Sequence, residues 1–96
     1  MKSGAVYIVA NRKNGAIYTG SASKLVQRVY QHREMVIEGF TKTHGGVKLV
    51  WFEVHEDLQQ ARAREPQIKR WKRSWKVRMI EEANPDWRDL WFELQG

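Results

Sequence analysis

The stretch AVYIVANRKNGAIYTG, residues 5–20, decides the fold of this chain. It opens with six apolar residues, rich in β-branched and aromatic side chains, that are typical of a strand covered on both faces. Asn14-Gly15 is a strong signal for a tight turn, and residues 16–20 then have the composition of a second strand. We therefore predict that residues 5–20 form a β-hairpin.

The sequence that follows the hairpin predicts a helix and a third strand. Ser21-Ala-Ser23 offers side chains that can cap a helix, which we expect to run from about Lys24 into the mid-thirties. Glycines then interrupt a polar segment. Val47-Lys-Leu-Val-Trp-Phe-Glu-Val54 has the apolar, β-branched composition of a third strand.

The second half of the chain predicts two more helices. Asp57 is a plausible N-cap for the first of them, whose pattern is interrupted by Pro66. The second is expected from about Lys69 to Glu82, and residues 87–94 form a short closing segment. The apolar stripe of this second helix is expected to pack in the core rather than to stack on bases. It consists of Ile68, Trp71, Trp75 and Met79.

Length, order of elements and composition together indicate one α+β domain spanning residues 1–96. There is no cysteine, which excludes disulfides and thiolate metal sites. No stretch approaches the roughly 20 apolar residues of a transmembrane helix, and the N-terminus lacks a signal-peptide pattern. We therefore expect a cytoplasmic protein.

The charge of the chain favours a polyanionic partner. Seventeen Lys and Arg against eleven Asp and Glu leave a net charge of +6. Eight of the basic residues lie between Arg62 and Arg78, a run that a solvated helix face explains equally well. Membrane binding is poorly motivated because the tryptophans in this run are assigned to the core. The residues expected to contact nucleic acid are Lys69, Arg70, Lys72, Arg73 and Lys76.

Arg28 and His32 are four residues apart, so they are neighbours on one face of the first helix. His32 falls within the apolar stripe of that helix and Arg28 at its edge, and both are expected to face the sheet. Such a pair costs desolvation unless an anion is near. A bound phosphate would meet that need, and so would Glu53 or Glu56, so a structural polar network is the commoner explanation.

Three other polar residues also have ordinary explanations when each is taken alone. Tyr7 and Tyr18 are aromatic residues on strands, where they pack well. Glu65 can form an i, i+4 ion pair with Lys69.

The order and spacing of these residues are specific where each residue alone is not. Ala5-Val6-Tyr7 is followed eleven residues later by Tyr18-Thr19-Gly20, and the two resemble the tripeptides that name the GIY-YIG endonuclease family. Arg28 stands ten residues after Tyr18, where that family places an arginine. His32 matches a family position for histidine or tyrosine, and Glu65 matches the metal-binding glutamate.

The resemblance covers the chain from Ala5 to about Leu90 and is strongest to small stand-alone bacterial members. These share runs similar to Glu38-Gly-Phe-Thr-Lys42 and Asn84-Pro-Asp-Trp-Arg-Asp89. Ala5-Val6 stands in place of Gly-Ile in the first tripeptide and Thr19 in place of Ile in the second, and both replacements are mild. Pro66 is a larger departure, because it either kinks the helix and misplaces the neighbouring carboxylate or produces a bend native to the site.

The resemblance implies a three-stranded antiparallel sheet flanked by helices and a metal-dependent nuclease activity. Glu65 would hold one divalent ion, Mg²⁺ or Mn²⁺, with water completing its shell. Arg28 would clamp the opposite side of the phosphate. Tyr7, Tyr18 or His32 would orient or deprotonate the attacking water, and the sequence leaves the choice among these three open.

The leading hypothesis is therefore an endonuclease that cuts DNA with low intrinsic sequence specificity, DNA being favoured over RNA as the substrate. Family nucleases often gain specificity from an appended DNA-binding domain, and its absence here suggests a targeting protein partner. The main alternative is a non-catalytic nucleic-acid-binding module that keeps the fold. A third is an adaptor, whose marker would be an exposed tryptophan patch at Trp87 and Trp91.

Overall fold

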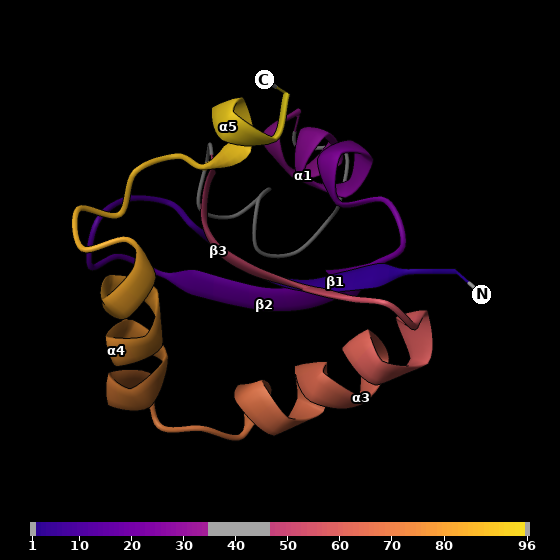
Figure 1. Ribbon diagram of the computed structural model, residues 1–96. Helices are drawn as coiled ribbons and strands as arrows, with labels where there is room; N and C mark the ends of the chain where they lie inside the picture. The colour runs from indigo at the N-terminus through magenta and orange to yellow at the C-terminus, as the bar shows by residue number, and fades with distance from the viewer. Residues whose placement is uncertain (1, 35–46, 96) are drawn as a thin grey trace.

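The computed structural model describes residues 2–34 and 47–95, and within these ranges it contains three strands packed between helices (Figure 1). The strands are β1 (Gly4–Ala10), β2 (Ile17–Ala22) and β3 (Lys48–His55). They form one sheet in the order β2-β1-β3, and β1 pairs antiparallel with both neighbours. The predicted hairpin and the predicted α+β fold with a three-stranded antiparallel sheet are therefore confirmed.

Helices cover both faces of the sheet (Figure 1). Helix α1 (Leu25–Arg33) and the short α5 (Trp91–Gln95) lie on one side, whereas α3 (Leu58–Lys69) and α4 (Arg73–Ala83) lie on the other. Asp57 caps α3 as predicted, because its carboxylate accepts a 2.9 Å hydrogen bond from a backbone N–H in the first turn. The sheet is thus the middle layer of the molecule.

Strand β1 is central, and each of its residues is buried. Its side chains alternate between the two faces of the sheet. Val6 and Ile8 belong to the core that α3 and α4 cover. Tyr7 and Val9 belong to the core that α1 and α5 cover. The alternation therefore places Tyr7 on the α1 side, opposite Gly20 of β2 in the strand register.

The boundary predicted between the second and third helices was wrong. Helix α3 continues through Pro66 to Lys69, and α4 begins only at Arg73. Proline removes one helical hydrogen bond, but Ala61 and Ile68, on either side of it, are fully buried against the sheet. Burial of both apolar residues favours one continuous helix over a break at Pro66.

One tryptophan prediction was wrong, and Trp87 does not form the exposed patch that would mark an adaptor. Trp75 is 53% exposed rather than in the core, because the chain bends between α3 and α4 and the expected single stripe does not form. Trp71 is partly buried and packs edge-to-face on Trp75. Trp87 is fully buried, and its indole N–H donates to Glu81 Oε2 at 2.8 Å. A patch that combines an exposed Trp87 with Trp91 is therefore excluded.

The run Asn84–Asp89 holds the end of the chain against the sheet. The Asn84 amide donates to the carbonyl of Val50 on β3, and one Asp89 oxygen accepts from the backbone N–H of Leu49. Asp89 also forms an ion pair with Arg33 at the end of α1. The segment therefore ties β3 to α1 and fixes where α1 lies on the sheet.

Two further points concern a sequence run of the family and membrane spans. The run 38–42 lies outside the described residues. Among the helices of residues 2–34 and 47–95, none has the length and hydropathy that a membrane span requires.

Candidate active site

Tyr7 and His32 form a buried polar pair between β1 and α1. The Tyr7 hydroxyl lies 3.0 Å from His32 Nε2, and both side chains are about 2% exposed. Burial, and then the charge of Arg28, lower the pKa of His32, so its imidazole is neutral near pH 7. Burial also raises the pKa of Tyr7, followed by the effect of Tyr18, so its phenol stays protonated. The pair is thus neutral and hydrogen-bonded.

His32 has unused hydrogen-bonding capacity. Its Nδ1 is buried and has no hydrogen-bond partner within the part of the chain that the structure describes. Tyr18 packs on the same imidazole, with ring centres 5.5 Å apart. His32 therefore faces the sheet as predicted, where both tyrosines surround it.

Gly20 makes room for both tyrosines. A Cβ atom at this position would stand 2.6 Å from the Tyr7 hydroxyl and 3.0 Å from Tyr18 Cε2. Contacts that short are too close for non-bonded atoms, so a side chain at position 20 would displace at least one ring. The third residue of the second tripeptide therefore has a steric role that motif spacing alone does not reveal.

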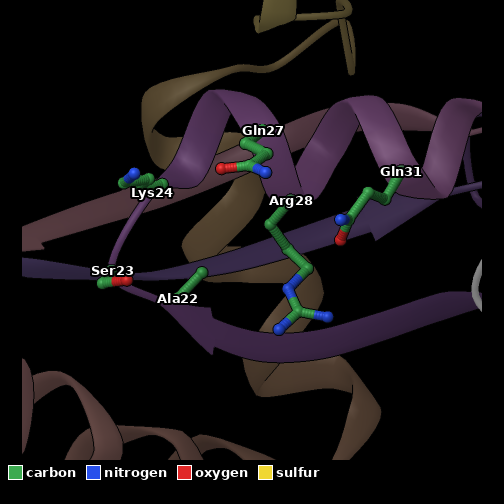
Figure 2. Close-up of a pocket in the computed structure, with 6 residues that line it drawn as sticks. All are labelled: Ala22, Ser23, Lys24, Gln27, Arg28 and Gln31. Atoms are coloured by element: carbon green, nitrogen blue, oxygen red, sulfur yellow. The ribbon is translucent and has the colours of Figure 1, made fainter.

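Arg28 projects from α1 toward β2. Figure 2 shows its guanidinium group extending from the helix toward the strand that leads into it. The residue is exposed, so the prediction that it faces the sheet is right in direction but not in burial. It lines a pocket of about 190 Å³ together with Ala22, Ser23, Lys24, Gln27 and Gln31.

The acidic residues that were alternatives to phosphate do not partner Arg28. Glu53 accepts from Arg64 Nε at 3.2 Å and from His55 Nε2 at 2.8 Å. Within residues 2–34 and 47–95, Arg28 forms no ion pair with a carboxylate. Its guanidinium is therefore available to an incoming anion.

Glu65 reaches β2 from the opposite face of the sheet. Its Oε1 accepts a 2.6 Å hydrogen bond from the Ser21 hydroxyl, and its Oε2 lies 2.7 Å from Lys69 Nζ. Partial burial alone would raise the pKa of Glu65, but the hydrogen bonds from Lys69 and Ser21 outweigh it and lower the pKa. The carboxylate is therefore ionised and held against the edge strand. The expected pairing of Glu65 with Lys69 is confirmed.

Pro66 does not turn the carboxylate of Glu65 away. The helix continues beyond Pro66, and the backbone N–H of Arg70 donates to the Pro66 carbonyl at 3.2 Å. Glu65 keeps a helical position from which it reaches Ser21. Of the two expectations for Pro66, a break that displaces the carboxylate is not observed.

The candidate residues thus gather around one edge of the sheet. Strand β2 is an edge strand, and Arg28 approaches it from the α1 side while Glu65 approaches it from the α3 side. Both charges act on Tyr7, one lowering and one raising its pKa. The ammonium of Lys69 lies 5.3 Å from the centre of the Tyr18 ring. The structure therefore brings all five motif residues together.

The donors at this edge fit a weakly held divalent ion rather than a closed metal cage. Within the described ranges, no three His, Asp or Glu side chains gather as ligands. An ionised carboxylate is nevertheless what Mg²⁺ prefers, and such ions often take one or two carboxylates with water and substrate phosphate. The proximity of Lys69 shows that Glu65 already attracts a cation.

The basic residues predicted to bind nucleic acid differ in their surroundings. Lys69 pairs with Glu65, and Lys76 Nζ donates to the Lys69 carbonyl at 3.2 Å. Arg73 donates to the carbonyls of residues 14 and 15 in the hairpin turn. Arg70 and Lys72 are exposed. The run therefore combines Arg73, which binds the hairpin turn, with the exposed cations Arg70 and Lys72.

Comparison with known proteins identifies the family. The pattern of the GIY-YIG catalytic domain matches residues 3–78. The chain belongs to the GIY-YIG family. That match contains all the residues described above, including Gly20 and Glu65. The GIY-YIG assignment indicates a nuclease domain, and hence a nucleic-acid substrate.

Relatives of similar length support the GIY-YIG assignment. A UPF0213 protein from Staphylococcus aureus (strain Mu3) is 38% identical over 82 residues, which cover 85% of this chain and 99% of that protein. A UPF0213 protein from Clostridium perfringens is 36% identical over 75 residues, covering 78% and 80%. The expected resemblance to small bacterial members is confirmed.

A solved structure shares the GIY-YIG fold. The solution NMR structure of the UPF0213 protein BH0048 from Bacillus halodurans matches with a TM-score of 0.56 and 22% sequence identity. The match covers 91% of this chain and 92% of that one. At this identity, it supports the fold.

Sequence inspection missed one partner in the site. The sequence suggests Ser21, the residue after the second tripeptide, only as part of a helix cap, yet its hydroxyl positions Glu65. The period-2 alternation of β2 places Ser21 on the α3 side, which is the only available signal. Its partner could be identified only after α3 was placed on the sheet.

Proposed function

We propose that this chain is a divalent-metal-dependent endonuclease that hydrolyses phosphodiester bonds in DNA with low intrinsic sequence specificity. The observation that carries the proposal is the approach of Arg28 and Glu65 to edge strand β2 from opposite faces of the sheet. The net charge of +6 supports a polyanionic substrate. DNA as the preferred nucleic acid, a targeting protein partner and a cytoplasmic location remain predictions.

Arg28 is proposed to bind the scissile phosphate. Its guanidinium lines an open pocket at the end of β2 and carries five N–H donors that match phosphate oxygens. Charge that develops on the phosphate during attack strengthens these bonds, so Arg28 stabilises the transition state more than the substrate. The same positive charge draws the phosphate toward Tyr7 and Tyr18.

Glu65 is proposed to hold one Mg²⁺ or Mn²⁺, with water as the other ligands. The Ser21 hydroxyl fixes one carboxylate oxygen, and the other oxygen, which faces Lys69, is the one proposed to contact the ion. Such an ion, when bound, supplies Lewis-acid polarisation of a phosphoryl oxygen and stabilises charge at the leaving oxygen. Lys69 must share Glu65 with that ion or move away from it.

Tyr7 and His32 are proposed to remove the proton of the attacking water. As the water oxygen bonds to phosphorus, its proton passes to the Tyr7 oxygen while the Tyr7 proton passes to His32 Nε2, 3.0 Å away. Neutral His32 with its ring proton on Nδ1 leaves Nε2 able to accept that proton. The bond from phosphorus to the leaving oxygen breaks, and solvent protonates that oxygen. Tyr18, which packs on His32, is proposed to position the water.

The non-catalytic binding module is the second candidate, and Pro66 is one motive for it. Because α3 continues through Pro66 and keeps Glu65 on Ser21, that motive weakens. A binding module and a nuclease both require the cationic surface, but only the nuclease requires Glu65. Cleavage is therefore the measurement that separates the two candidates.

The test is metal-dependent cleavage of supercoiled plasmid and of labelled branched DNA. We expect the wild-type protein to cut with Mg²⁺ or Mn²⁺ and to be inactive in EDTA. Glu65→Gln and Arg28→Ala should each lose at least about 100-fold in rate, the scale seen when one transition-state contact is removed. Both variants should remain folded, as judged by circular dichroism.

Matched control variants test whether the cleavage comes from a contaminant and whether a change in net charge alone reduces it. Glu82→Gln and Arg88→Ala change exposed residues outside the site by the same chemistry. They should cut like the wild type. If all five proteins cut equally, the activity belongs to a contaminant and the nuclease proposal fails. If none cuts but all bind DNA, the binding module replaces it.

A further inference from the structure

An apolar groove runs along the exposed side of α1. Its volume is about 600 Å³, within the range of about 300–1,000 Å³ that is typical of ligand sites. Tyr30 is 52% exposed and Val26 is 40% exposed, so the groove presents large apolar side chains to solvent. Its lining residues are Lys24, Leu25, Val26, Gln27, Tyr30 and Trp91.

The groove adjoins the pocket that contains Arg28. Lys24 and Gln27 line both hollows, so one continues into the other around the helix. At about 100° per residue, Arg28 and Tyr30 lie about 160° apart on the helix surface, with Gln27 between them. Figure 2 shows Gln27 and Arg28 projecting from successive positions of α1, with Arg28 turned toward β2. A single strand that places a phosphate on Arg28 can therefore reach Tyr30 by continuing across Gln27.

The chemistry of the groove matches a nucleobase. Aromatic side chains stack with the faces of bases, and nearby cations hold the adjoining backbone. Tyr30 supplies an exposed ring, and Lys24 supplies a cation at the junction of the two hollows. Trp91 is held in place because Arg33 covers its ring, 4.4 Å from the centre, and its N–H donates to the carbonyl of Val26. The combination of aromatic and basic groups favours a polyanion that carries bases.

We propose that this α1 groove stacks an unpaired base of a single strand that continues across Gln27 from a phosphate on Arg28. The inference rests on the proposed function and adds a substrate class to it. Bases of an intact duplex are stacked within the helix, so their faces cannot reach Tyr30. The groove therefore selects nucleic acid with a single-stranded segment, such as a branch or an overhang, next to the cut site.

The test compares Tyr30→Leu with wild type in binding to a labelled oligothymidylate and to a duplex of equal length. Fluorescence anisotropy is measured in EDTA, so that binding is read without cleavage. Leucine keeps an apolar side chain but removes the ring. Single-strand affinity should fall at least about five-fold, since base–aromatic stacking contributes about 1–3 kcal/mol. Duplex affinity should change less than about two-fold.

Trp75→Leu is the matched control, because it removes another exposed aromatic ring from α4, outside the groove. It should bind both DNAs like wild type. Equal single-strand affinity of Tyr30→Leu and wild type would overturn the proposal. An equal loss for single strand and duplex would also overturn it, because the groove would then contact only the backbone.

Two further outcomes separate this inference from others. If Tyr30→Leu changes a dimer into a monomer in sedimentation without altering DNA binding, the groove is an interface between copies and the proposal fails. The nuclease function is judged separately, by plasmid cleavage with Glu65→Gln and Arg28→Ala. Absence of cleavage leaves the binding comparison in EDTA valid, whereas absence of any wild-type binding contradicts both.

Discussion

The ammonium of Lys69 lies 2.7 Å from Glu65 Oε2 and 5.3 Å from the centre of the Tyr18 ring. One helical turn separates the two charged residues on α3, so their pairing alone is ordinary. Its position beside Tyr18 is not, because it puts a cation at the edge of β2 next to the carboxylate proposed to hold a metal. A divalent ion bound at Glu65 has to compete with Lys69.

Replacing Lys69 by Met should therefore strengthen Mn²⁺ binding. Partly exposed ion pairs contribute about 0.2–1 kcal/mol, so the dissociation constant should fall between about 1.4-fold and about five-fold. Titration followed by electron paramagnetic resonance of Mn²⁺ measures it directly. Lys72→Met removes the same charge away from Glu65 and should have a smaller effect. Unchanged or weaker Mn²⁺ binding in Lys69→Met would contradict the competition.

Gly20→Ala should destabilise the fold and disturb the site. The added methyl would stand 2.6 Å from the Tyr7 hydroxyl, and Tyr7 cannot yield freely because it is buried and bonded to His32. Overpacking of this kind costs about 1–3 kcal/mol. Urea unfolding measures the loss. In a double-mutant cycle, Tyr7→Phe should recover part of it, and simple additivity would show that this contact is not the cause.

His32 should make the protein less stable in mild acid. Burial, and then Arg28, lower the pKa of His32 in the folded state, whereas the unfolded chain protonates near the ordinary value of about 6.5. As the pH falls below about 6.5, the unfolded state takes up this proton first, so the free energy of unfolding decreases. The stability that the neutral imidazole provides is complete above that pH.

The measurement is urea unfolding of wild type and His32→Gln between pH 7.5 and 5. Glutamine keeps a hydrogen-bonding group for Tyr7 but does not titrate. The variant should lose less stability than wild type as the pH falls, so the difference between the two should narrow. Parallel curves would show that His32 protonates equally in both states.

The strands and the motif residues could be predicted because they depend on local signals. Asn14-Gly15 fixes the hairpin turn, and alternation along β1 and β2 decides which side chains share a face. The helix boundary near Pro66 could not be predicted in this way. Propensity favours a break there, but burial of Ala61 and Ile68 against the sheet decides the outcome. That burial is tertiary and leaves no local signal.

The tryptophans show the same limit. Trp71 and Trp75 form one apolar stripe only if a single helix carries both. The chain bends before Arg73, which leaves Trp75 exposed to solvent. An exposed Trp87 would mark an adaptor, yet this residue is fully buried. The indole N–H of Trp87 donates a hydrogen bond to Glu81, which allows the side chain to be completely buried. Long-range contacts decide both cases.

The basic run should divide into binding and structural residues. Arg70 and Lys72 are exposed, whereas Arg73 donates to the hairpin carbonyls of Asn14, at 3.2 Å, and Gly15, at 2.6 Å. Arg70→Ala combined with Lys72→Ala should weaken DNA binding uniformly across sequences. It should also reduce the slope of log affinity against log salt by about 1 for each phosphate that the variant no longer neutralises.

Arg73→Ala should act chiefly on stability. Loss of its bonds to the hairpin turn should lower the free energy of unfolding by about 1 kcal/mol, measured in urea, while the salt slope changes less than in the double variant. An Arg73→Ala protein with full stability and a reduced salt slope would reverse the assignment. The hydrogen bonds from Arg73 to the turn would then contribute little to stability. Arg73 would belong to the DNA-binding surface with Arg70 and Lys72.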